Sequence, residues 1–199
     1  MGSAGVEERP NEPQRPTLGL AGLMRLCTRG VFGNRFPVMR QQMTGVFSEK
    51  DIAGVEAATP MFVHIAHFVL IRLKIDQLGM SCTPDDFMTH WTAGFFAACE
   101  DAGMSEGESN ALWEEFTRVF KLYRARWMVL EPDEINRFGL PFWTQAMFAD
   151  QFVPPRHDYT QQEKEAHKRI FDGAGFIMKD FQEILSDAFE SHRIMTAVD

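Results

Sequence analysis

Two histidines, His64 and His67, are the residues whose types and spacing first suggest chemistry. Residues three positions apart lie on one side of a helix, where imidazoles bind metal ions or haem iron. A complete site needs further ligands, and His90 on the next expected helix is the nearest candidate. The Glu-x-x-His pairs that complete many metal sites in helical bundles are absent around both histidines. We therefore favour packing roles, and keep a metal- or haem-binding bundle using His64, His67 and His90 as the alternative function.

The remaining reactive groups form no catalytic motif. Cys27, Cys82 and Cys99 are odd in number and lack Cys-x-x-Cys spacing, so we expect no disulfide framework and a reducing, intracellular compartment. No Gly-x-Ser-x-Gly motif is present, and paired acids such as Asp85 and Asp86 stand at expected helix starts, where the helix dipole explains them. We expect no catalytic residue, no metal and no cofactor, and hence no enzyme. A scattered acid–base site is the remaining enzymatic alternative.

Arginines are concentrated ahead of the main body of the chain. Between Pro13 and Phe47 there are five arginines, no lysine and no acid, whereas from Ser48 onward 14 basic residues stand against 25 acidic ones. An acid-free, arginine-rich amphipathic segment is typical of an organelle transit peptide, which would indicate a mitochondrion. The alternative is a basic arm that lies on the acidic body or on an acidic partner. As candidate partner contacts we single out Arg25, Arg29, Arg35 and Arg40.

The charge distribution excludes some kinds of partner. An acidic body is a poor general binder of nucleic acid, because that affinity comes largely from Lys and Arg on phosphates. The longest uncharged run, between Glu56 and Arg72, has 15 residues, fewer than the roughly 20 that span a bilayer. We expect no nucleic acid partner, no secretory signal at residue 1 and no transmembrane span, and leave open a peripheral contact with a membrane.

The histidines lie in the most hydrophobic stretch of the chain, from Pro60 to Leu78. A helix that is apolar on nearly every face belongs in the middle of a bundle. We expect Pro60 in its first turn and Thr59 as its N-cap, after a short separate helix that starts at Ser48 and runs toward Ala58.

Helix-start patterns divide the rest of the chain. Capping boxes begin at Thr83, Ser105 and Thr160. Gly139 separates two short helical segments, and Gly173 and Gly175 interrupt the last apolar stripe, which they kink, split or open to another helix.

No segment alternates apolar and polar residues over a strand-like length. We therefore predict an all-α fold, an irregular helical bundle of six to eight helices with an extended N-terminal arm. The predicted division is a tail and basic amphipathic arm over 1–47 and an acidic helical-bundle domain over 48–199. The absence of a catalytic motif and the many Phe, Met and Trp residues favour a non-enzymatic helical interaction protein. We expect it to be a subunit or assembly component of a larger complex, with other protein subunits as partners.

Overall fold

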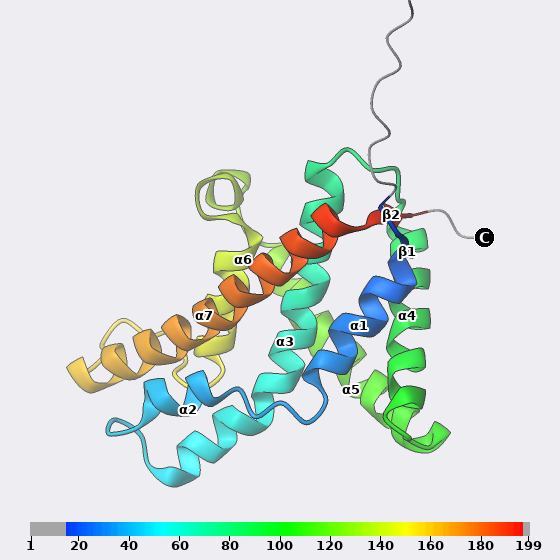
Figure 1. The fold of residues 1–199 in the computed structure, drawn as a ribbon. Helices are drawn as coiled ribbons and strands as arrows, with labels where there is room; N and C mark the ends of the chain where they lie inside the picture. The colour runs from blue at the N-terminus through cyan, green and yellow to red at the C-terminus, as the bar shows by residue number, and fades with distance from the viewer. Residues whose placement is uncertain (1–14, 197–199) are drawn as a thin grey trace, which may run out of the picture.

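The computed structural model describes residues 15–196 of the 199-residue chain. This part contains seven helices and two three-residue strands, and Figure 1 shows their arrangement. In chain order the elements are β1 (Thr17–Gly19), α1 (Leu20–Val31), α2 (Pro37–Met43), α3 (Glu49–Gln77), α4 (Pro84–Asp101), α5 (Glu106–Trp127), α6 (Pro132–Asp150), α7 (Gln161–Ser191) and β2 (Arg193–Met195). The prediction of an all-α bundle of six to eight helices is confirmed. Residues 1–14 of the predicted tail lie outside the described residues.

Helix α3 forms the axis of the bundle. It packs against α1, α2, α5, α6 and α7, and the other helices surround it in Figure 1. Within residues 15–196, α3 is the helix that is long and apolar enough to cross a membrane by length and composition, yet 61% of that apolar stretch is buried inside the protein. Its hydrophobicity is thus largely accounted for by packing in the core.

The predicted helix boundary at Pro60 is wrong. Helix α3 runs from Glu49 to Gln77 with Pro60 in its interior, and it bends along its length (Figure 1). Thr59 is no N-cap, because its hydroxyl donates to the Val55 carbonyl at 2.8 Å. An interior proline costs about 3 kcal/mol. Burial of α3 on both sides of Pro60 offsets that cost, which the local sequence pattern cannot reveal.

The other helix starts follow their sequence patterns. Thr83, Ser105 and Thr160 each accept a hydrogen bond from the backbone three residues on and complete a capping box. Gly139, at φ 77° and ψ 157°, divides α6 into the two predicted segments. Helix α7 continues unbroken through Gly173. At this glycine another helix approaches closely, since an added Cβ would lie 2.7 Å from the Met39 sulfur of α2.

The helices before residue 48 share a core with those after it. Helix α1 lies so close to α4 that a Cβ on Gly94 would stand 2.5 Å from the Ala21 carbonyl oxygen and 2.8 Å from Met24 Cβ. Six residues of α1 and α2 are buried in the core that includes α3, namely Leu20, Leu23, Met24, Val31, Met39 and Met43. The boundary after residue 47 stays a prediction.

Strands β1 and β2 pair in parallel at one end of the bundle. Thr17, Leu18 and Gly19 stand opposite Arg193, Ile194 and Met195, so segments from the two ends of the described chain lie side by side (Figure 1). Strands of three residues are too short to leave an alternating pattern, which is why the sequence did not predict them.

Candidate functional site

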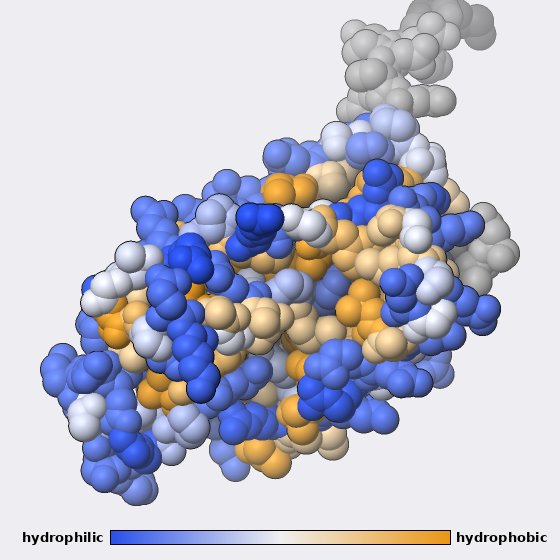
Figure 2. Space-filling view, turned by 90° about the horizontal axis from the view of Figure 1, so that it is seen from below, coloured by the Kyte–Doolittle hydropathy of each residue, from blue (hydrophilic) through white to orange (hydrophobic). Residues whose placement is uncertain are grey.

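A cavity of about 440 Å³ lies between α1, the start of α2, α3 and α7. Its walls are mainly hydrophobic: α1 supplies Leu23, Leu26 and Val31, α3 supplies Val63, and α7 supplies Ile177 and Phe181. On the molecular face drawn in Figure 2, hydrophobic side chains gather around a hollow near the centre. At the cavity, Leu26 and Ile184 are 55% and 63% exposed. The cavity therefore has an apolar interior and an apolar margin.

His67 is the buried polar side chain of the cavity wall. Its ring packs on the Phe181 ring with centroids 3.8 Å apart and planes 31° from parallel. Nδ1 is enclosed and has no hydrogen-bond partner within the described residues. Burial, with a smaller contribution from His64, lowers the pKa of His67 well below the usual 6.5. The imidazole is therefore neutral near pH 7, and its ring forms part of the cavity wall.

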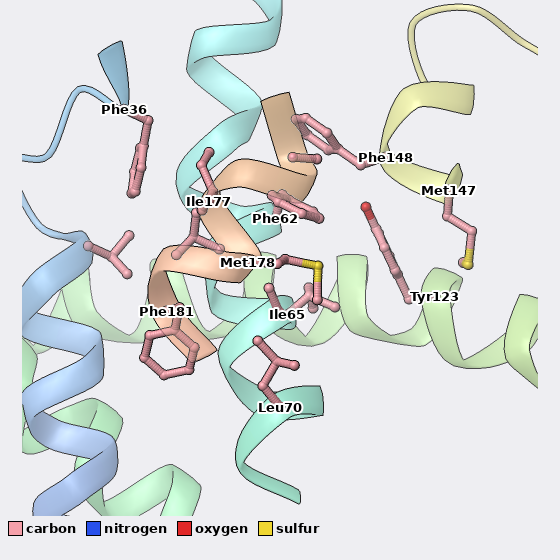
Figure 3. Packing of buried hydrophobic residues seen from close by; sticks show 14 of the residues in the cluster. Phe36, Phe62, Ile65, Leu70, Tyr123, Met147, Phe148, Ile177, Met178 and Phe181 are labelled. Atoms are coloured by element: carbon pink, nitrogen blue, oxygen red, sulfur yellow. The ribbon is translucent and has the colours of Figure 1, made fainter. Parts of the chain in front are cut away.

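Phe36 lines the cavity in a strained backbone conformation. It has φ 42° and ψ 62°, the left-handed region that bulky residues rarely occupy. The Asn34 side chain supports this turn by accepting a hydrogen bond from the Phe36 N–H at 2.9 Å. Figure 3 shows Phe36, Ile177 and Phe181 on one side of α3, while Phe62, Phe148 and Tyr123 lie on the other. Both Asn34 and Phe36 line the cavity.

Cys27, which also lines the cavity, is no nucleophile. Burial raises the pKa of its thiol to about 12. Since the thiolate is the reactive form, this side chain stays protonated and unreactive at neutral pH. Cys27 contributes a small apolar surface to the wall.

His64 stands one helical turn from His67 in a different environment. Its ring lies among Phe32, Phe95 and Phe116, with centroid separations of 6.2, 5.7 and 6.4 Å. Burial lowers its pKa to about 4, and its Nδ1 has no partner among residues 15–196. The structure thus places His64 in an aromatic cluster and His67 at the cavity.

The third histidine of the alternative metal or haem site is used elsewhere. His90 Nε2 lies 3.2 Å from the Thr196 carbonyl oxygen, beyond the end of β2. Over the described part of the chain, no group of three or more His, Cys, Asp or Glu side chains is placed to hold a metal ion. The arrangement of His64, His67 and His90 therefore offers no shared metal site.

Three of the four arginines that the sequence singled out pair with acids of their own chain. Arg25 Nε donates to Asp101 at 2.7 Å and Arg29 lies 3.6 Å from the same carboxylate, and the Arg25 hydrogen bond lowers the pKa of Asp101. Arg40 lies 2.9 Å from Glu56 and 3.2 Å from Glu49. Arg35 is exposed. These pairs attach the basic segment to the acidic body, while roles in partner binding and in mitochondrial targeting stay predictions.

The cavity itself was missed at the level of sequence. Leu23, Leu26, Ile177 and Ile184 fit ordinary helical stripes, and a stripe does not show whether it meets a neighbour or an open space. The one usable signal was His67, a polar side chain within the most apolar helix.

No protein-family model, no curated protein and no solved structure gives a significant match to this chain. The cavity and the exposed surface are therefore the features of the chain that indicate a function.

Proposed function

We propose that this chain is a non-enzymatic helical binding protein that holds an apolar ligand in the cavity between α1, α3 and α7. The observation that carries the proposal is the cavity of about 440 Å³ with hydrophobic walls. Ligand sites typically measure about 300–1,000 Å³ and are mostly apolar with a few polar groups. Protein interiors are otherwise packed with few voids larger than a water molecule. An apolar ligand that fills this space removes hydrophobic surface from water, which favours binding.

The chemistry of the wall supports binding rather than catalysis. Among the described lining residues, the groups that could act on a substrate are the Cys27 thiol, the His67 imidazole and the Asp180 carboxylate. Cys27 stays protonated because its pKa is about 12. Burial holds His67 neutral, and no hydrogen-bonded acid orients its ring in the part of the chain that the structure describes. The wall therefore lacks an activated nucleophile paired with a base.

The test is binding of a fluorescent apolar probe, N-phenyl-1-naphthylamine, to the full-length chain. Ala188 is half-buried and lines the cavity, so Ala188→Phe fills the space that the probe would occupy. Ala125, exposed on α5, provides the matched control Ala125→Phe. We expect the wild type and Ala125→Phe to bind the probe with equal affinity and Ala188→Phe to lose most of it. The proposal is contradicted if the wild type does not increase the fluorescence of the probe. It is also contradicted if Ala188→Phe binds the probe as well as the control does.

A second candidate function is the interaction subunit expected from the sequence, and the end of α5 favours it. Leu122, Met128 and Val129 are 58%, 76% and 77% exposed there, beside exposed Lys121 and Arg124. Clustered exposed hydrophobic side chains mark interaction surfaces. The two cations suit a partner subunit with acidic residues around an apolar patch.

The interaction surface is tested by parallel native pull-downs of three full-length forms. The double variant Leu122→Glu/Val129→Glu removes the patch, and Leu78→Glu changes an exposed leucine at the end of α3 as the control. We expect one protein to be recovered by the wild type and by Leu78→Glu but lost from the double variant. Recovery of the same proteins by all three forms argues against a subunit contact at α5.

A further inference from the structure

We infer that the cavity takes an uncharged, largely apolar molecule with one hydroxyl group, an alcohol of medium chain length, whose hydroxyl meets the His67 imidazole. This inference rests on the proposed function, because it names the class of ligand for the same cavity. Four observations carry it: the size and apolarity of the cavity, the burial of His67, its missing hydrogen-bond partner and the charges around the space.

The unpartnered imidazole indicates a polar group on the ligand. His67 is 95% buried, given its 5% exposed fraction, and its Nδ1 is enclosed without a partner in the described residues. Buried polar groups in proteins are nearly always hydrogen-bonded, and a buried imidazole that lines a cavity without such a bond is the polar group of the wall that a ligand is best placed to meet. Because Nδ1 is enclosed, our inference places the ligand hydroxyl at Nε2, the other nitrogen of this cavity-lining ring.

A hydroxyl suits this imidazole in either of its forms. A neutral imidazole carries one N–H and one lone pair, and which nitrogen bears the proton depends on its surroundings. A hydroxyl donates one hydrogen bond and accepts others. It therefore pairs with Nε2 whether that atom is the donor or the acceptor. A ketone or ether pairs with only one of the two forms.

The charges around the cavity argue against an anionic ligand. No lysine or arginine is found among the described residues that line it, and the one charged lining side chain is Asp180. His67 provides no positive charge at neutral pH because burial lowers its pKa. A carboxylate headgroup would thus lie near Asp180 and a neutral imidazole, without a cation to replace its lost hydration. Fatty acids are therefore disfavoured relative to the alcohols of the same length.

An aliphatic amine is the nearest competitor, since its ammonium group could pair with Asp180. Asp180 is exposed, however, and an ion pair in contact with water contributes little. An ammonium at Asp180 would also leave His67 without a partner. Buried His67 therefore indicates the headgroup of the ligand better than Asp180 does. Exposed Asp180 disfavours a ligand with a negative charge.

The test compares four eight-carbon ligands as competitors of N-phenyl-1-naphthylamine on the full-length chain: 1-octanol, octanoate, octylamine and octane. We expect 1-octanol to displace the probe at concentrations about tenfold lower than octane or octanoate, the effect of about one net hydrogen bond. His67→Leu should abolish the advantage of octanol over octane, and His67→Gln, which keeps a hydrogen-bonding side chain, should retain part of it. His64→Leu serves as the matched control, because His64 lies outside the cavity lining, and should leave the ratio unchanged.

A second measurement covers the case in which His67→Leu does not fold. The ring nitrogen resonances of His67 in the wild type should move when octanol is added and stay in place with octane. If octanoate or octylamine competes best, or if octanol does not move the His67 resonances, the assignment of an alcohol is overturned. The proposed function still stands in that case, provided that the cavity binds the probe. If the probe never binds, the proposed function itself has failed.

Discussion

Side chains fill the space on the two sides of α3 to different extents. His64 and His67, one helical turn apart, lie on the two different sides. Toward α4 and α5, aromatic rings pack in tilted and stacked pairs, as with Phe95 and Trp113 at 5.0 Å and Trp113 and Phe116 at 5.3 Å. Toward α1, α2 and α7, the side chains leave about 440 Å³ open. The same helix therefore supports a dense core on one side and a binding space on the other.

The cavity stays open because its walls are attached to other helices more closely than to α3. Gly94 lets the α1 backbone lie directly on α4, and Gly173 leaves room on α7 for the Met39 side chain of α2. Packed helices without such glycines stay 8–10 Å apart, with side chains between them. Two close attachments thus hold α1 and α2 in place beside α3. A cavity of this kind is a property of the helix arrangement and does not need large side chains to prop it open.

The largest expected effect contrasts one phenylalanine from each side. Phe116→Ala removes a ring enclosed by Trp91, Trp113 and Phe120 and should lower the free energy of unfolding by about 3–5 kcal/mol. Phe181→Ala should cost only about 2–3 kcal/mol, since Phe181 already faces open space and the residual void joins an existing one. Chemical denaturation of both variants measures the difference. Equal costs would mean that the cavity side is as tightly packed as the aromatic side.

Part of the acid sensitivity of the fold should come from His64. Its pKa is about 4 in the folded protein and near 6.5 when unfolded, so below pH 6.5 the unfolded chain binds a proton that the folded chain does not. Stability contributed by the neutral ring is complete above pH 6.5 and falls by about 1.4 kcal/mol for each pH unit toward pH 4. We expect His64→Phe, which keeps a ring among Phe32, Phe95 and Phe116, to show a shallower loss between pH 6.5 and 4.5. Identical slopes for both proteins in denaturation series would assign the acid sensitivity to other groups.

The attachment of α1 can be broken without touching the cavity wall. Gly94→Ala places a methyl group against the backbone of Ala21 and Arg25, where overpacking costs about 1–3 kcal/mol. The variant should also bind the apolar probe more weakly, because α1 forms one wall. Gly107→Ala is the control, since nothing lies within 4 Å of its added Cβ, and it should be stabilised by about 0.5–1 kcal/mol. Melting temperatures and probe titrations of both variants check the two effects together.

The smallest expected effect comes from Gly30, which lies in α1 and lines the cavity. An added Cβ there meets no atom within 4 Å, so Gly30→Ala should stabilise the protein by about 0.5–1 kcal/mol. Gly33→Ala should instead destabilise it, because Gly33 has φ +75°. Differential scanning calorimetry resolves shifts of this size. If Gly33→Ala stabilised the protein, the connection between α1 and α2 would not be held in the left-handed conformation at residue 33.

The sequence predicted much of the helical framework because the signals for it are local. The helix starts at Thr83, Ser105 and Thr160 are indicated by capping boxes of four residues, and the break in α6 is indicated by the single residue Gly139. Pro60 was misjudged because its tolerance depends on the burial of α3 by distant helices. The cavity escaped for the same reason: whether Leu26 and Ile184 meet a neighbour is decided by where α1 and α7 lie, and no spacing within either helix records that.

The parallel pairing of β1 with β2 has a mechanical consequence. Because both strands point the same way, a pull on residues 15 and 196 would drive them past one another lengthwise. The hydrogen bonds of the short ladder, with Arg193 N–H to the Pro16 carbonyl at 3.0 Å beside it, would then carry the load together instead of opening one by one. Under tension this small sheet would act as a latch, and its rupture would release α1 from one end of the chain and α7 from the other.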